Sequence, residues 1–275
     1  MSQGGASSKK EKEPKTKEGE QLGLIVYNPQ AKQEEQSKKT VDETKALASK
    51  IGLNVDNSVF DKVPTDFLYS TLEEAGKLIN EYGVDASELV NRVTMFKGSS
   101  SYGSTSGGLK GNINLYDGWY TNLNAFKKSY EHDIKEKFHP KGDYRDVLVH
   151  EMAHRIEGAL GNKAGFSGAY PSGKNVGKGW SSIMSAMYGN SATSDLIQTA
   201  IKNIKKTAYG KGKHNYELRE AISRYCVRYD DKRKWSETFA EALTDYNRNG
   251  AGANPLSIEI ARLAKEYLDG WKINK

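Results

Sequence analysis

The segment from Asp143 to Gly161 constrains the fold more than any other part of the chain, because it is typical of a buried helix. Asp143 is a favourable N-cap residue, and Gly161 is a helix stop signal. Apolar residues recur between them at helical spacing and predict a face turned toward a core: Val149, Met152, Ile156 and Leu160. A chain containing this helix therefore needs a second layer to cover that face.

Two histidines lie on the same helix, four residues apart, at His150 and His154, and Glu151 follows the first. Residues at this spacing project from one side of a helix, so two imidazoles can hold one Zn²⁺. Glu151 can then take a proton from zinc-bound water as it attacks a carbonyl, and pass it to the leaving amine. A solvated polar face is the alternative. The apolar run 147–149 argues against it, because buried histidines need partners.

The third zinc ligand is not fixed by this helix. Glu157 lies seven residues after His150, close to the same face, and stays open as a ligand. The other histidines precede the motif or lie in a Lys/Gly-rich loop: His132, His139 and His214.

A second helix, with Ser236 as its expected N-cap, offers a stronger pair in Glu237 and Glu241, four residues apart. One carboxylate can ligate zinc while the other orients a ligand histidine through its free N–H. Without a metal, the two would form an ordinary solvated face or an N-terminal charge bias.

The combination of His150, His154 and the run 237–241 (Glu-Thr-Phe-Ala-Glu) resembles the gluzincin metallopeptidases related to the catalytic domain of anthrax lethal factor. That group includes the Pro-Pro endopeptidases and phage-encoded peptidases. The resemblance covers about residues 91–248. It implies a zincin-like fold and one Zn²⁺ held by both histidines and Glu237. It also implies that Glu241 contacts one of these ligands without binding the ion itself.

The run 223–226 (Ser-Arg-Tyr-Cys) is similar to a Ser-x-Tyr-small run that precedes the Glu-containing helix in this group. The resemblance implies that Tyr225 stabilises the oxyanion. The interval from Tyr225 to Glu237 is longer than in lethal factor, with Tyr229–Lys234 inserted. Tyr229 is therefore the alternative candidate for stabilising the oxyanion. Phe138-His139-Pro140 also looks like the phage-type members.

The remaining pattern predicts an α+β fold, with a small mixed sheet followed by a mostly helical second half. Short strands are expected at Val93–Phe96 and Ile113–Tyr116, joined by a Ser/Gly-rich connection over 98–108. We expect the strand at 113–116 to be the edge that pairs with an extended substrate. Helices are expected at about 122–137, 144–160, 193–208, 214–227, 236–248 and 256–269.

The expected organisation is a disordered charged arm over residues 1–30, an amino-terminal helical segment over 31–90, and a metallopeptidase domain over 91–275. Helices are expected at 33–51 and 70–82, the second begun by a capping box of Thr71 and Glu74.

The net charge of +6 is concentrated in residues 200–235. No nucleic-acid-binding motif accompanies it, so we expect a solvated basic face rather than a nucleic-acid site. No apolar run is long enough to cross a bilayer, and the amino terminus lacks the apolar stretch of a secretory signal. The single cysteine, Cys226, rules out an internal disulfide.

Together these features predict a zinc-dependent endopeptidase that acts on a peptide or protein in the cytoplasm or in association with a virion. The resemblance implies that it is encoded by a phage or mobile element. The alternative is a non-catalytic virion structural or interaction protein on a metallopeptidase-like fold. The charged arm and the amino-terminal helices favour this alternative, since neither has an evident catalytic role. In that case the amino-terminal segment would contact a virion or mobile-element partner.

Overall fold

A computed structural model describes residues 38–107, 110–163, 192–228 and 234–272. The chain divides into two units, Met1–Ser37 and Lys38–Lys275, and all described residues belong to the second. The predicted arm over 1–30 lies outside the described residues.

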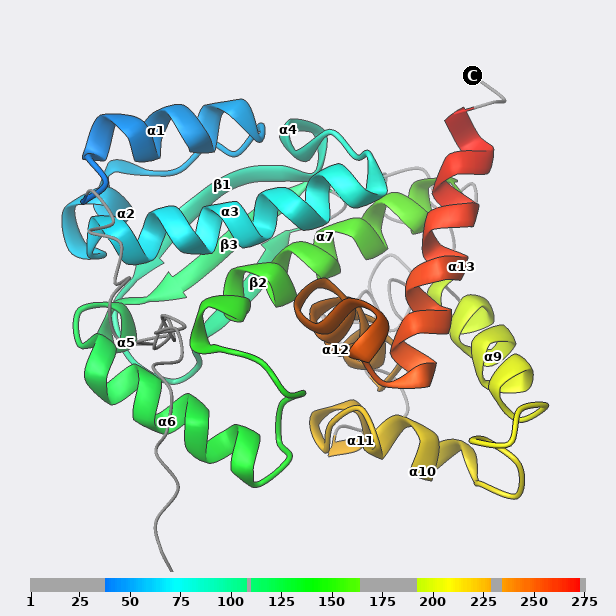
Figure 1. Ribbon diagram of the computed structural model, residues 1–275. Helices are drawn as coiled ribbons and strands as arrows, with labels where there is room; N and C mark the ends of the chain where they lie inside the picture. The colour runs from blue at the N-terminus through cyan, green and yellow to red at the C-terminus, as the bar shows by residue number, and fades with distance from the viewer. Residues whose placement is uncertain (1–37, 108–109, 164–191, 229–233, 273–275) are drawn as a thin grey trace, which may run out of the picture. The chain divides into compact units, whose positions relative to one another are not determined.

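The sheet has three strands in the order β1-β3-β2 (Figure 1). β1 (Val90–Phe96) is parallel to β3 (Gly111–Tyr116), and β2 (Gly103–Gly107) is antiparallel to β3. The mixed α+β class with a small sheet and a mostly helical second half is confirmed. The prediction that 113–116 forms an edge strand is wrong, because β3 lies at the centre.

β2 lies within the Ser/Gly-rich stretch, which the sequence pattern treats as a connection. It has no apolar alternation, so the usual strand signal is missing. Side-chain hydrogen bonds to the central strand accompany its backbone pairing: the Asn114 amide donates to the hydroxyls of Ser104 (3.2 Å) and Ser106 (3.3 Å). These polar cross-strand contacts occupy one face of the sheet, while Ile113 and Leu115 are buried on the other.

Four helices precede the sheet: α1 (Val41–Lys50), α2 (Asn57–Lys62), α3 (Thr65–Tyr82) and α4 (Ala86–Leu89). α3 begins before the predicted residue 70, directly after Pro64. Thr71 is buried in its interior, so the predicted capping box with Glu74 is wrong. A real capping box begins α1, where the Thr40 hydroxyl accepts from Glu43 N–H and the Glu43 carboxylate accepts from Thr40 N–H.

The second half is mostly helical and contains, in chain order, α5 (Asp117–Tyr120), α6 (Leu123–Lys135), the 3₁₀ turn η1 (Tyr144–Asp146), α7 (Val147–Lys163), α9 (Ala192–Ile204), α10 (Asn215–Glu220), α11 (Tyr225–Arg228), α12 (Lys234–Asn249), η2 (Gly250–Gly252) and α13 (Pro255–Lys272). Several predicted helix ranges differ from the structure. α7 continues past Gly161, α9 ends at Ile204 rather than at residue 208, and the helix expected at 214–227 is two short helices. Among the described helices, none has the length and apolarity needed to span a membrane.

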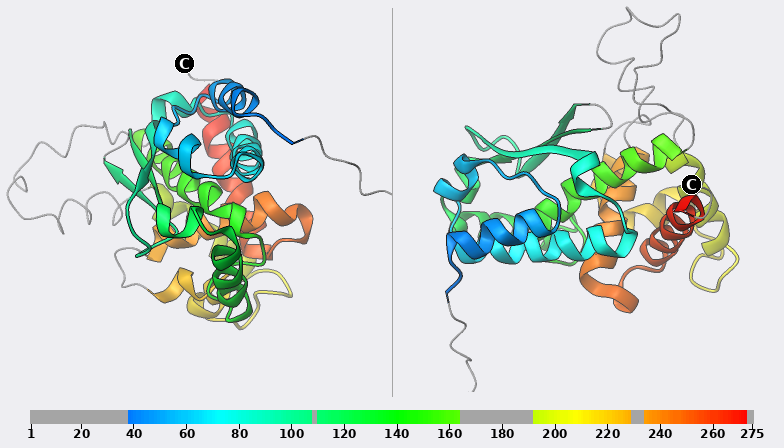
Figure 2. Two further views of the ribbon diagram at one scale, coloured as in Figure 1. Left: turned by 90° about the vertical axis from the view of Figure 1, so that its left-hand side faces the viewer. Right: turned by 90° about the horizontal axis from the view of Figure 1, so that it is seen from above.

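α7 is the central helix of this unit. Both views of Figure 2 place it between the sheet and α3, and it also contacts α12. Its residues Leu148, Val149, Met152 and Ile156 are fully buried. The helices before the sheet share one hydrophobic core with α7, α9, α12 and α13. The domain boundary at residue 91 stays a prediction.

A buried ion pair joins the carboxyl end of α12 to the start of α7. The Arg248 guanidinium donates to the carboxylate of Asp146, which is almost fully buried, and lies 3.5 Å from Glu74 on α3. Burial raises the pKa of Asp146, and Arg248 acts against that rise. Arg248 thus compensates a carboxylate that would otherwise be buried without a counter-charge.

We expect Arg248→Met to lower the free energy of unfolding by about 3 kcal/mol, since it leaves the Asp146 carboxylate buried and unpaired. Urea denaturation at pH 7 measures this change. The matched control is Arg262→Met, because Arg262 pairs with Glu259 and Glu266 on the exposed side of α13. That change should cost at most about 1 kcal/mol. Equal losses in the two variants would contradict a special role for the buried pair.

Candidate metal centre

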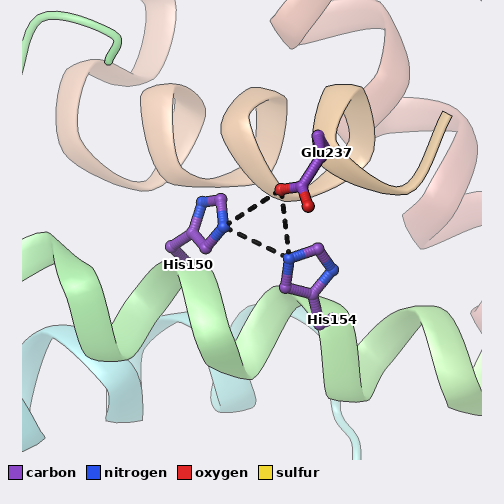
Figure 3. Close-up of side chains that lie close together, drawn as sticks. All are labelled: His150, His154 and Glu237. Carbon is purple, nitrogen blue, oxygen red and sulfur yellow. Dashed lines mark hydrogen bonds and ion pairs between the residues drawn. The ribbon is translucent and has the colours of Figure 1, made fainter. Parts of the chain in front are cut away.

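α7 and α12 face each other and bring three predicted ligands together, although Glu237 is distant from the histidines in sequence. Figure 3 shows His150 and His154 projecting from α7 toward Glu237 on α12. The two Nε2 atoms lie 3.2 Å apart, and Glu237 Oε2 lies 3.5 Å from each of them. Within the described ranges, this is the one group of side chains with the composition and spacing of a metal site.

These distances fit a tetrahedral ion. Two ligand atoms at about 2.0–2.1 Å from a tetrahedral Zn²⁺ are about 3.3–3.4 Å apart, close to the three separations of 3.2, 3.5 and 3.5 Å. Glu237 Oε2 is buried and accepts no hydrogen bond from the described residues. A metal ion bound between this oxygen and the two Nε2 atoms would replace their ion pairs with direct coordination, so the donor set fits zinc.

The Nδ1 atom of His150 faces a second carboxylate. It lies 2.9 Å from Oε1 of Glu241, which is almost fully buried on α12 one turn after Glu237. The same Oε1 is 3.3 Å from Nδ1 of His139. A carboxylate that holds Nδ1–H orients the ring so that Nε2 faces a metal and is the nitrogen that loses its proton when the metal binds. The two glutamates thus face different atoms: Glu237 faces the Nε2 atoms of both histidines, and Glu241 faces Nδ1 of His150.

His154 has a different support. Its Nδ1 lies 3.1 Å from the hydroxyl of Ser236, and that hydroxyl donates to Oε2 of Glu157 at 2.5 Å. Glu157, which periodicity leaves open as a ligand, therefore lies on the Nδ1 side of His154, away from the group formed with Glu237. The prediction of Ser236 as N-cap is wrong, because α12 begins at Lys234 and the Ser236 hydroxyl is used by this contact.

In the metal-free protein, the positive charges of the histidines and the negative charges of the glutamates stabilise one another. Burial lowers the pKa of both histidines, but the neighbouring carboxylates outweigh it and raise the pKa of His150 to about 9 and of His154 to about 10. Burial raises the pKa of both glutamates, but the histidine charges outweigh it. The pKa of Glu241 is therefore lowered to about 2, and that of Glu237 lies well below its usual range.

These shifts predict a pH-dependent stability of the metal-free protein. A raised histidine pKa stabilises the fold fully below the unfolded value of 6.5 and loses that contribution as pH rises through about 9 to 10. In the presence of a chelator, the melting temperature should therefore fall by several degrees between pH 6.5 and 10. Thermal melts followed by circular dichroism measure this, and His150→Gln/His154→Gln should remove most of the fall. A wild-type curve parallel to that of the double variant would contradict the assignment.

Glu151 projects from α7 toward the sheet. A Cβ atom added to Gly103 would lie 3.0 Å from the Glu151 carboxylate and 2.9 Å from Val147, so β2 can approach α7 this closely only with glycine there. Glu151 is buried, and this burial raises its pKa against the opposing charges of His150 and His154. A raised carboxyl pKa suits a group that accepts a proton near neutral pH.

Tyr225 lies at the border of the site. Its ring centroid is 6.0 Å from that of His150 and 5.4 Å from that of His139. Its backbone N–H donates to the carbonyl of Phe138 at 3.1 Å, and the Arg224 N–H donates to that of Lys137 at 2.7 Å. The second tyrosine candidate, Tyr229, lies outside the described residues.

Two residues of the site were not identified from the sequence. The sequence pattern places His139 before the motif and gives it no ligand role, and in the structure its Nδ1 contacts Glu241. Its ring stacks on Tyr130 with centroids 5.1 Å apart and an interplanar angle of 7°. Ser236 was assigned to a helix cap. A serine directly before a candidate ligand, or a histidine just before the motif helix, carries no local signal of such contacts.

Comparisons of the chain with protein-family models, with characterised proteins and with solved structures found no match. The site is therefore interpreted from its own geometry and chemistry.

Proposed function

We propose that this chain is a zinc-dependent endopeptidase on a zincin-like fold, with His150, His154 and Glu237 as the metal ligands. The observation that carries the proposal is the mutual separation of three ligand atoms from two facing helices, which matches a tetrahedral zinc ion. Glu151 lies on the same helix as both histidines and is buried beside β2. Together these groups supply metal binding and proton transfer in one place.

Bound zinc would supply Lewis acidity, lowering the pKa of a water molecule and polarising the peptide carbonyl. The Glu151 carboxylate would accept the proton of the attacking water and return it to the nitrogen of the leaving amine. Glu241 and Ser236 hold the Nδ1 sides of the two histidines, so Nε2 is the nitrogen of each ring that would give up its proton and bind the metal. Tyr225 would donate its hydroxyl proton in a hydrogen bond to the oxyanion.

The substrate would bind as an added strand along β2. The outer side of β1 is already paired, since Val93 exchanges backbone hydrogen bonds with the segment 54–56. Within the described ranges, no strand pairs with the outer side of β2. An extended peptide can use such an edge for backbone hydrogen bonds, and Gly103 in β2 contacts Glu151. β2 thus replaces 113–116 as the proposed substrate strand.

The test is metal analysis of the purified full chain together with a cleavage assay on a broad peptide library. We expect about one zinc per chain, cleavage that a chelator abolishes, and recovery on adding Zn²⁺. Protein that takes up no stoichiometric zinc would reject the proposal. Zinc binding without any cleavage would favour the alternative, a non-catalytic virion structural or interaction protein. Encoding by a phage or mobile element stays a prediction of the resemblance.

A further inference from the structure

We propose that Ser236 and Glu157 are positioning residues that hold His154 in its metal-binding orientation and fix α12 relative to α7. Their contact is called the Ser236–Glu157 bridge here. The inference rests on the proposed metal site and extends it, because it assigns a role to two buried polar residues that neither bind the metal nor touch the substrate.

The direction of the hydrogen bonds determines which nitrogen of His154 carries the proton. A serine hydroxyl has a single proton, and Ser236 donates it to Glu157 Oε2 at 2.5 Å. The oxygen can then only accept, so the contact of 3.1 Å with His154 Nδ1 requires Nδ1 to be the donor. His154 Nε2, which lies beside His150 and Glu237, is then the nitrogen that can lose its proton and turn a lone pair toward a metal. The bridge thus selects the tautomer that a metal needs.

Glu157 does not replace the hydroxyl in this role. Its Oε2 is 3.6 Å from His154 Nδ1, which is beyond hydrogen-bond distance, so the serine oxygen makes the connection. Ser236 also directly precedes the ligand Glu237 and lies 82 positions after His154 in the chain. One hydroxyl therefore fixes the register of the helix bearing Glu237 against the helix bearing His154.

The cost of the arrangement supports a functional role. Ser236 and Glu157 are both almost fully buried, and Glu157 Oε1 has no hydrogen-bond partner among the described residues. Burying a carboxylate with one oxygen unsatisfied opposes folding. Stability alone would favour an apolar residue at this position of α7.

The two histidines are then supported in parallel from α12. Glu241 contacts His150 Nδ1 directly at 2.9 Å, and Ser236 contacts His154 Nδ1 at 3.1 Å. Both supports lie on the same helix as the third ligand. A small displacement of α12 would therefore disturb all three ligand atoms together.

The test compares Ser236→Ala with Ser257→Ala in the full chain. Ser257 is a matched control, because it is fully buried on α13 and its hydroxyl has no partner among the described residues. Zinc affinity is measured by competition with a chromogenic chelator, and ligand geometry by the visible spectrum of the Co²⁺-loaded protein. We expect Ser236→Ala to weaken zinc binding about 10- to 100-fold and to change the Co²⁺ spectrum, while Ser257→Ala does neither.

Two further variants keep the test decisive if Ser236→Ala does not fold. Ser236→Thr retains the hydroxyl and should restore wild-type affinity. Glu157→Gln preserves the side-chain volume but removes the charge that fixes the serine proton, so it should weaken zinc binding in the same direction. Wild-type affinity and an unchanged Co²⁺ spectrum in both Ser236→Ala and Glu157→Gln would overturn the inference and leave the metal site standing. A wild-type chain that binds no zinc would overturn both.

Discussion

Glu151→Gln should retain one zinc per chain and lower kcat/KM for a cleaved peptide by about 10³-fold or more. The amide keeps the shape of the side chain against Gly103 but cannot accept the proton of the attacking water. General-base catalysis contributes about 10²–10⁴-fold to a rate, so loss of the base should appear almost entirely in kcat. Elemental analysis and steady-state kinetics on the same preparation measure the two quantities.

The control for this variant is Glu88→Gln, because Glu88 is an exposed carboxylate on α4 and is not one of the three ligands. It should keep both zinc and activity. If Glu151→Gln cleaved peptide at the wild-type rate with zinc bound, Glu151 would not be the base. If Glu151→Gln lost its zinc, the assignment of Glu151 as a base that does not bind the metal would be wrong.

Glu237→Ala should lower bound zinc well below one ion per chain, the second large effect expected at this site. The change removes the oxygen that lies 3.5 Å from both Nε2 atoms and leaves only two nitrogen ligands. Structural and catalytic zinc sites use at least three protein ligands, so two histidines should not retain the ion through dialysis. Elemental analysis after dialysis measures the loss.

Glu241→Ala is the matched comparison, since Glu241 lies one turn later on the same helix face. It should keep zinc at saturating concentration but bind it about 10- to 100-fold more weakly, because His150 loses the acceptor for its Nδ1 proton. His139 loses its partner in the same variant. The reverse ranking, with zinc lost in Glu241→Ala and kept in Glu237→Ala, would exchange the roles of the two carboxylates.

The strands show where local pattern fails. Val93–Phe96 and Ile113–Tyr116 are apolar enough to be predicted as strands, and both are present in the sheet. The local pattern does not identify β2, because its Ser, Thr and Gly residues are as typical of a loop as of a strand. Its pairing depends on Asn114 in the neighbouring strand, and this dependence is not visible in the run itself. The identity of the edge strand therefore followed from tertiary pairing.

The sequence by itself determined the relation of His150 to His154, because a four-residue spacing on a helix places two side chains on one face whatever surrounds them. The same rule put Glu237 and Glu241 on one face of a second helix. Which glutamate faces the Nε2 atoms, and whether the two helices meet at all, was decided by the packing of α7 against α12. Ser236, Glu157 and His139 join the site through contacts between distant segments. Helical periodicity is enforced by hydrogen bonds within a single turn, whereas these contacts exist only once separate elements pack together.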